Sequence, residues 1–178
     1  GTTADACIAT RPGVAATVMV ADCLPVLLTD TAGRAVAAAH AGWRGLAGQG
    51  GVGVLEATVA ALRQRVGPKA PLLAWLGPCI GPTAFEVGAE VREVFCATDA
   101  AAAAHFQAAA PGKFLCDLAG LAKQRLSALG VTATYGNDGS APWCTVRSES
   151  AFFSHRRDAV RLGSTGRMAA CIWRNGPL

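Results

Sequence analysis

Short apolar runs alternate along the chain with stretches that have helical spacing, and turn residues separate them. The apolar runs predict strands, because β-branched and other apolar residues suit the half-buried surface of a sheet. The predicted strands cover residues 14–20, 23–29, 35–41, 72–76, 131–135 and 167–173, and the first ten residues have the pattern of a strand and turn. We expect the strand at 167–173 to be buried, since it is apolar at nearly every position.

Three stretches predict helices, at residues 54–66, 87–96 and 117–129. The last carries apolar residues at 118, 121, 122, 126 and 129, which lie on one helical face, and Gly130 follows as a suitable C-terminal residue. Helices and strands do not alternate strictly. The order therefore favours an α+β fold with a mixed sheet over a purely parallel one.

The composition indicates one globular domain over residues 1–178. Hydrophobic residues make up 52% of the 178 positions and charged residues only 16%, which excludes a disordered chain. No run approaches the roughly 18 apolar residues of a membrane-spanning helix, so we expect no membrane partner. The seven cysteines are odd in number and form no CxxC pair, which favours a reducing cytoplasm over a secreted disulfide framework.

The basic residues suit a small ligand better than a nucleic acid. The net charge is +4, and only three of the 16 basic residues are Lys. Six of the Arg lie between Arg147 and Arg174, without the spread of basic and aromatic side chains that a nucleic-acid surface uses. Guanidinium groups form forked hydrogen bonds, so this cluster favours a planar or phosphate-bearing small molecule.

Cys23 and His40 are the most informative pair. Each lies at the end of a predicted strand, and a single turn joins the two strands, so we expect the side chains to be adjacent. A thiolate beside an imidazole suits either a Zn²⁺ site or a Cys–His nucleophilic pair. The alternative is a buried cysteine next to a hydrogen-bonded core histidine. The polar neighbours Asp22, Trp43 and Arg44 favour a functional site, because a buried structural pair does not need them.

Two further segments could carry chemistry. Cys79 lies in a loop rich in Gly and Pro that follows a predicted strand; it could be a nucleophile, but alone it is better explained as structural. Phe153 precedes Arg156 and Arg157, which together could stack on a base and bind phosphate. The alternative there is a surface turn in which Arg156 or Arg157 pairs with Asp158 or Glu149.

Four motifs, in this order, resemble those of one family. They are ADCLPVLL at 21–28, AAHAGWRGLA at 38–47, LAWLGPCIGPTAFEVGAEV at 73–91, and CT, FFSHRRD and TGRMAACIW between 144 and 173. Together they are similar to the laccase-domain purine nucleoside phosphorylases, also called multicopper polyphenol oxidases. The resemblance covers essentially the whole chain.

The resemblance implies a layered sandwich of mixed β-sheets covered by helices, and a zinc site of two His and one Cys. The family's Cys corresponds to Cys23 and one of its His to His40. The other metal-binding His belongs to an upstream Val-His-Gly segment that this chain does not match, and His155 stands where the family commonly has Tyr. We therefore expect residues 1–178 to be a domain that lacks its N-terminal segment, in which the missing ligand lies before Gly1.

The implied activity is phosphorolysis of adenosine, inosine and S-methyl-5′-thioadenosine, with adenosine deamination as a further activity. Zinc is the expected cofactor, with copper possible, and purine nucleosides and phosphate are the expected partners of a monomer or homodimer. Phosphorolysis needs phosphate held against the ribose C1′ while the departing base is stabilised. The catalytic candidates are Asp22, Arg44 and Arg156, and the substrate-binding candidates are Trp43, Phe153 and Arg157.

Three other functions stay open. A copper-dependent phenol oxidase fits poorly, because multicopper chemistry needs many His ligands and the chain has three. A Cys–His hydrolase or amidase would use Cys23 with His40. A non-catalytic binding module would follow if the upstream His were never present.

Overall fold

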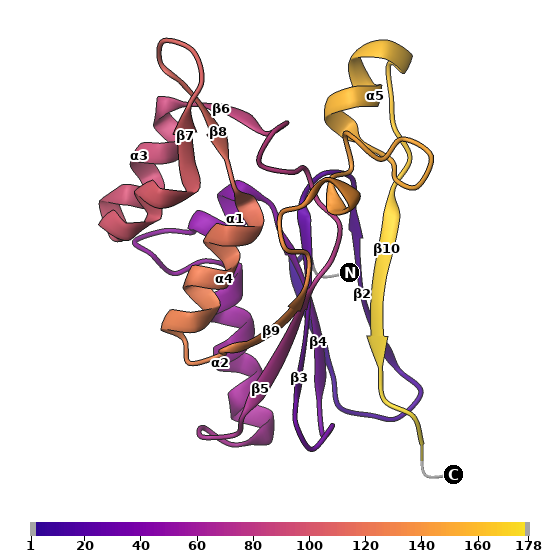
Figure 1. The fold of residues 1–178 in the computed structure, drawn as a ribbon. Helices are drawn as coiled ribbons and strands as arrows, with labels where there is room; N and C mark the ends of the chain where they lie inside the picture. The colour runs from indigo at the N-terminus through magenta and orange to yellow at the C-terminus, as the bar shows by residue number, and fades with distance from the viewer. Residues whose placement is uncertain (1–2, 177–178) are drawn as a thin grey trace.

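The central element is a five-stranded sheet with strand order β1-β4-β3-β5-β9, in a computed structural model that describes residues 3–176 (Figure 1). All neighbours in it are antiparallel except β5 and β9, which are parallel, so the mixed sheet expected from the sequence is confirmed. The strands are β1 (Ala6–Ala9), β3 (Leu24–Asp30), β4 (Val36–Ala41), β5 (Leu72–Leu76) and β9 (Ala133–Gly136).

Two smaller sheets accompany it. One pairs β2 (Ala15–Val20) with β10 (Met168–Trp173) in antiparallel register along their full length. The other has the order β6-β8-β7. Its strands are β6 (Glu86–Gly88), β7 (Phe106–Ala108) and β8 (Lys113–Cys116).

The helices between residues 43 and 128 lie on one side of the five-stranded sheet. The β2–β10 pair lies on the other side, with the helix His155–Leu162 beyond one end of β10 (Figure 1). This confirms the predicted α+β class with its layered sheets covered by helices. The helices are α1 (Trp43–Ala47), α2 (Val54–Val66), α3 (Ala89–Thr98), α4 (Leu118–Ala128) and α5 (His155–Leu162), with 3-10 turns η1 (Ala100–His105) and η2 (Ala141–Trp143).

Strand β4 lies between the two packed layers, which explains its run of alanines. Successive side chains of a strand point to opposite faces. Ala37, Ala39 and Ala41 therefore join the core on the helical side, whereas Val36 and Ala38 join a second core beneath the β2–β10 pair. Small side chains on both faces let the two layers approach the same strand.

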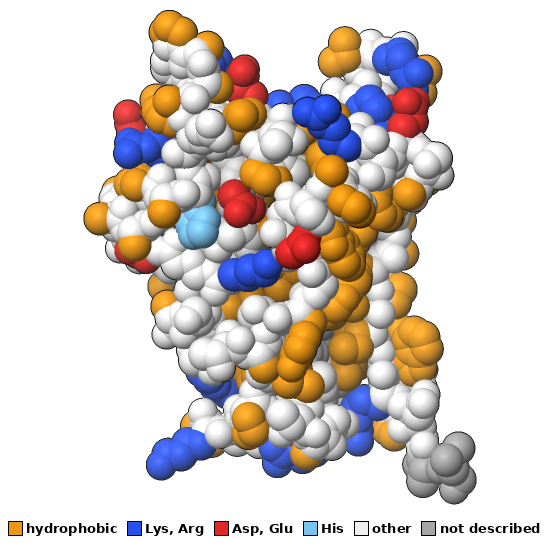
Figure 2. All heavy atoms as spheres, in the orientation of Figure 1, with side chains coloured by type: hydrophobic (Ala, Val, Ile, Leu, Met, Phe, Trp, Pro, Cys, Tyr) orange, Lys and Arg blue, Asp and Glu red, His pale blue; other side chains and the backbone are white. Residues whose placement is uncertain are grey.

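The outer layer covers only part of the sheet. A hollow of about 390 Å³, lined by Leu27 and Trp75 among others, separates β10 from β3 and β5. Figure 2 shows hydrophobic side chains gathered along this side of the molecule. Trp75 and Tyr135 are both exposed, although the Trp75 ring meets the ring of Trp143 in η2 edge-on at 6.1 Å.

The predicted strands exist, with ends shifted by two residues or fewer, and α2 has the predicted bounds. The expectation that 167–173 is buried was wrong: β10 alternates between half-buried and exposed positions because one of its faces meets solvent. The helix predicted at 87–96 begins later, since residues 86–88 pair with β8. The predictions did not include α1, α5 or the strands β6, β7 and β8.

Within residues 3–176 no helix is both long enough and apolar enough to cross a membrane. All seven cysteines lie in this part of the chain, and each is a free thiol.

Candidate metal and substrate pocket

Cys23 and His40 lie side by side, as their positions on adjacent strands predicted. Cys23 immediately precedes β3, and His40 lies on β4 opposite Pro25 of β3. Both side chains line one cavity of about 240 Å³, whose wall also includes Trp43 and Arg44. This confirms the expected geometry and defines what we call the thiol–imidazole pocket, lined by Asp5, Cys23, His40, Gly42, Trp43, Arg44 and Gly45.

Gly42 provides the room that the Cys23 sulfur occupies. A Cβ atom at Gly42 would lie 2.9 Å from Cys23 Sγ and 3.7 Å from His40 Cε1. The first distance is shorter than a normal contact, so any side chain at this position would displace the thiol. The glycine that follows His-Ala in the sequence is thus part of the site.

Asp5 binds His40 at two points. Its carboxylate Oδ1 lies 3.1 Å from His40 Nδ1, and its main-chain oxygen accepts a hydrogen bond of 2.7 Å from the His40 backbone N–H. The interaction with the Cys23 side chain is the largest cause that raises the pKa of His40 to about 9; Asp5 adds to it, and partial burial opposes it. The imidazole therefore holds a proton strongly in the metal-free pocket.

Trp43 and Arg44 form one rim of the pocket. The Arg44 guanidinium carbon lies 4.3 Å from the centre of the Trp43 ring, a stacked arrangement that presents a cation on an aromatic face. Arg44 is exposed, and no described carboxylate pairs with it. Its N–H groups are free to bind an anionic or polar ligand.

Asp22 is buried and connects the β2–β3 turn to α5. Its Oδ1 accepts a hydrogen bond of 2.5 Å from Thr145 Oγ1, and its Oδ2 accepts one of 2.6 Å from the Arg156 backbone N–H. Asp22 also adopts a φ of 80°, which is uncommon for a residue with a side chain. Both carboxylate oxygens are engaged, so Asp22 holds the turn that carries Cys23.

Arg156 and Arg157 have different surroundings. The Arg156 side chain is exposed; it donates two bonds of 3.2 Å to the Glu86 carbonyl and lies 5.7 Å from the Phe85 ring centre. Arg157 uses all five of its N–H groups within the chain. Its acceptors are both Asp158 carboxylate oxygens and the carbonyls of Thr145, Val146 and Phe152.

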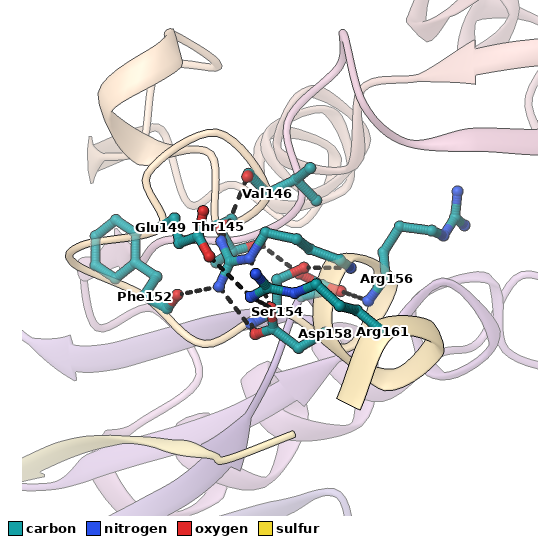
Figure 3. A network of polar contacts seen from close by, with 10 residues as sticks. Thr145, Val146, Glu149, Phe152, Ser154, Arg156, Asp158 and Arg161 are labelled. Carbon is teal, nitrogen blue, oxygen red and sulfur yellow. Dashed lines mark hydrogen bonds and ion pairs between the residues drawn. The ribbon is translucent and has the colours of Figure 1, made fainter. Parts of the chain in front are cut away.

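These bonds form what we call the Arg157 network, in the loop before α5 and in the helix itself (Figure 3). The hydrogen bonds of Arg157 are the largest cause that lowers the pKa of Asp158 to about 2. No guanidinium donor remains for a substrate, so the structure does not support the predicted substrate role of Arg157. Asp158, considered only as a surface partner in the sequence, is instead buried.

Phe153 lies outside the thiol–imidazole pocket. It is about half exposed and lines a separate hollow of about 320 Å³ beside α5, where Gly166 packs against its ring. The structure thus brings together four of the predicted residues, Cys23, His40, Trp43 and Arg44, and places Phe153 in a different hollow.

Cys79 is a packed core residue. It is 1% exposed, its sulfur accepts a hydrogen bond from Asn137 Nδ2 at 3.3 Å, and it donates one to the Ile80 carbonyl. Burial raises the pKa of its thiol far above the usual range. A buried thiol that stays protonated is a poor nucleophile, so the structural explanation is favoured.

A comparison with models of protein families shows the family of this chain. The model of the family described as multi-copper polyphenol oxidoreductase laccase matches residues 1–175. The chain belongs to this laccase family.

Relatives within the laccase family carry a common name. A Pseudomonas aeruginosa protein named purine nucleoside phosphorylase is 50% identical over 171 residues, and Escherichia coli YfiH, with the same name, is 51% identical over 170 residues. Each match covers 96% of this chain, but 64% and 63% of those relatives. The chain therefore spans slightly less than two thirds of their length.

Solved structures show the same fold. A Neisseria meningitidis protein superposes with a TM-score of 0.85 at 50% identity, over 97% of this chain and 65% of its own. YlmD from Geobacillus stearothermophilus gives a TM-score of 0.79 at 31% identity, over 97% and 61% of the two chains.

The thiol–imidazole pocket offers donor atoms of the kind that zinc prefers, but the described residues supply too few of them. A thiolate and an imidazole are usual zinc ligands, and zinc sites use at least three protein ligands. Within the described residues no three His, Cys, Asp or Glu side chains are grouped to hold one ion. The Asp5 carboxylate faces His40 Nδ1. A metal held by Cys23 and His40 therefore needs a further ligand from outside residues 3–176.

Proposed function

We propose that this chain supplies the catalytic pocket of a zinc-dependent purine nucleoside phosphorylase. The observation that carries the proposal is the single cavity in which Cys23 and His40 face the stacked pair of Trp43 and Arg44. The name shared by the laccase-family relatives supports the same reaction. The proposed substrates are adenosine, inosine and S-methyl-5′-thioadenosine, used with inorganic phosphate in the cytoplasm.

In this proposal Cys23 and His40 hold the zinc together with a ligand from outside the described residues. When bound, such a zinc supplies Lewis-acid polarisation and lowers the pKa of a bound water. Zinc is favoured over a copper cluster, because His105 and His155 line no part of the pocket and leave one imidazole in it. Adenosine deamination is the further activity proposed: water adds at C6 of the purine and ammonia leaves.

Arg44 and Trp43 would bind the substrates. In phosphorolysis a phosphate oxygen forms a bond to ribose C1′ while the glycosidic C–N bond breaks. The electron pair of that bond goes to the base nitrogen, which takes up a proton. The free N–H groups of Arg44 suit the phosphate or ribose, and the Trp43 ring offers an aromatic surface for the base. The exposed Arg156 would be a second phosphate-binding residue. Asp22 would hold the turn that positions Cys23.

Incubation of the protein with inosine, in the presence and absence of phosphate, tests the proposal. We expect phosphate-dependent release of hypoxanthine together with ribose 1-phosphate. Because the chain spans less than two thirds of its relatives, the same assay is run on a protein extended to their full length. Absence of turnover by the extended protein would contradict the proposal.

A Cys–His hydrolase is the second candidate, and one observation favours it. Cys23, His40 and Asp5 follow one another in space as a nucleophile, a base and a residue that orients the base. Such an enzyme would transfer an acyl group to water and would not need phosphate. Turnover that is indifferent to phosphate would therefore favour the hydrolase over the phosphorylase.

A further inference from the structure

We infer that Asp5 is a positioning residue for His40, which it orients so that the second ring nitrogen is presented to a metal beside Cys23. This inference rests on the proposed function, since it assigns a role within the same metal site. Asp5 was absent from the residues that the sequence indicated. It comes to His40 through a long-range pairing, because β1 lies against β4 with Ala6 opposite Ala39.

The contact fixes the ring in two independent ways. The main-chain oxygen of Asp5 accepts the His40 backbone N–H at 2.7 Å, which anchors the strand that carries the imidazole. The Asp5 carboxylate lies 3.1 Å from Nδ1, which anchors the ring itself. Only the second point depends on the side chain, so a substitution at Asp5 separates ring orientation from strand pairing.

The chemistry follows from the two nitrogens of imidazole. A carboxylate next to Nδ1 favours the tautomer in which Nδ1 carries the proton, and Nε2 is then left with the lone pair that a metal needs. A Cβ at Gly42 would lie 2.9 Å from Cys23 Sγ and 3.7 Å from His40 Cε1, the ring carbon between the two nitrogens, so the thiol and this edge of the imidazole border the same space. Asp5 therefore sets both the tautomer and the direction of the metal-binding nitrogen.

The exposure of Asp5 makes this role distinguishable from a structural one. Its side chain is 63% exposed, and an exposed pair with a histidine contributes little to folding stability. Loss of the carboxylate should therefore leave the melting temperature almost unchanged. A change in metal affinity without a change in melting temperature is what a positioning role predicts and a structural role does not.

The first experiment measures Zn²⁺ affinity by competition with a chelating dye, on the protein extended to the full length of its relatives and on variants of that protein, because the described residues supply only two of the ligands. We expect Asp5→Ala to bind Zn²⁺ about 10- to 100-fold more weakly, which is typical for the loss of a carboxylate behind a metal-binding histidine. Asp5→Asn keeps a hydrogen-bond acceptor and loses the charge, so its affinity should lie between those of the wild type and Asp5→Ala. The control is Glu93→Ala, which removes a carboxylate exposed on α3 and should leave the affinity unchanged.

The second experiment needs no metal. The ¹⁵N shifts of the His40 ring, recorded at alkaline pH where the imidazole is neutral, should show the proton on Nδ1 in the wild type. In Asp5→Ala the same shifts should move toward the average of the two tautomers. Equal shifts in both proteins would overturn the inference.

The two hypotheses fail in different ways. If Cys23→Ala loses Zn²⁺ binding while Asp5→Ala matches the Glu93→Ala control, Asp5 has no positioning role and the metal site stands. If Cys23→Ala also keeps the wild-type affinity, the metal site of the proposed function fails, and the inference fails with it.

Discussion

The Arg157 network and the thiol–imidazole pocket contain similar polar groups in opposite states. In the network, Arg157 donates five hydrogen bonds and Asp158 accepts on both oxygens. In the pocket, Arg44 stacks on Trp43 and pairs with no described carboxylate. The sequence presents both regions as an arginine beside an aromatic residue. What distinguishes them is whether the donors are already used.

The difference has a physical origin. A buried charge is costly unless its hydrogen bonds are satisfied, so a buried arginine must use its donors within the protein. An exposed arginine keeps its donors hydrated and can exchange water for a ligand. Saturated donors therefore mark structure, and unsaturated donors around a cavity mark a binding site.

The largest effect on stability should come from the network. Arg157→Ala leaves Asp158 and three carbonyls without their partner, and we expect the melting temperature to fall by roughly 10 °C. The matched control is Arg65→Ala, which removes an exposed arginine of α2 and should shift the melting temperature by at most about 2 °C. Thermal unfolding followed by circular dichroism compares the two. Equal shifts of the melting temperature in the two variants would show that the hydrogen bonds of Arg157 do not contribute to stability.

The pocket should respond in the opposite way. Cys23→Ala removes the only thiol of the pocket, and we expect at least a 100-fold loss of Zn²⁺ affinity and loss of phosphorolysis in the extended protein. The melting temperature of the metal-free chain should change by only a few degrees, because Cys23 is only partly buried. Elemental analysis of zinc measures the result. One zinc per chain in the variant would refute the role of Cys23.

A pair of glycine substitutions sharpens the geometry of the pocket. A Cβ at Gly42 would lie 2.9 Å from Cys23 Sγ, so Gly42→Ala should displace the thiol and weaken Zn²⁺ binding by about 10-fold. A Cβ at Gly176, which lies outside the pocket, would meet nothing closer than Pro12 Cβ at 3.9 Å. Gly176→Ala should therefore keep the affinity. The ratio of the two affinities, measured by dye competition, tests whether Cys23 needs the space at Gly42.

The two regions should also lose stability at opposite ends of the pH scale, and this effect should be the smallest. The pKa of Asp158 is lowered from 3.8 to about 2. The ionised Asp158 therefore contributes to the free energy of unfolding above pH 3.8, and this contribution is lost as the pH falls toward 2. The pKa of His40 is raised from 6.5 to about 9. The protonated His40 therefore contributes to the free energy of unfolding below pH 6.5, and this contribution is lost as the pH rises through 9. Urea unfolding of the metal-free chain measures both.

Two variants identify which group causes each fall in the unfolding free energy, the one at acid pH (the acid limb) and the one at alkaline pH (the alkaline limb). Asp158→Asn should flatten the acid limb and leave the alkaline limb unchanged. Cys23→Ala should flatten the alkaline limb, because the interaction with Cys23 is the largest cause of the shift at His40. An alkaline limb that persists in Cys23→Ala would place its origin elsewhere.

The sequence predicts the parts of the fold that depend on local pattern. Alternation and apolar runs located the strands that form the main sheet, and helical spacing located α2 and α4. It did not predict the short strands β6, β7 and β8, whose three- and four-residue segments become strands only through pairing with one another. The exposure of β10 also depends on which layer it joins, which its own composition does not determine.

The residues of the candidate site also differ in whether local sequence or long-range pairing brings them together. Cys23 and His40 were predictable because one turn joins their strands, and their separation in sequence is short. Asp5 was not, because it reaches His40 only after β1 pairs with β4, across 35 residues. For Arg157 the sequence left both a substrate role and a pair with Asp158 open, because the carbonyl acceptors that use up its donors leave no pattern in the side chains. Gly42 did have a signal, a glycine directly after the His-Ala of a strand end.

The alanines of β4 have a consequence for protein engineering. Ala37 and Ala39 face the helical core and Ala38 faces the opposite one, so a single added methyl group on this strand thickens one layer or the other. His40 is carried on the same strand, and any such thickening moves it relative to Cys23. A library designed to change ligand preference should therefore keep residues 36–41 fixed and vary the exposed rim at Arg44, where new side chains can extend into solvent.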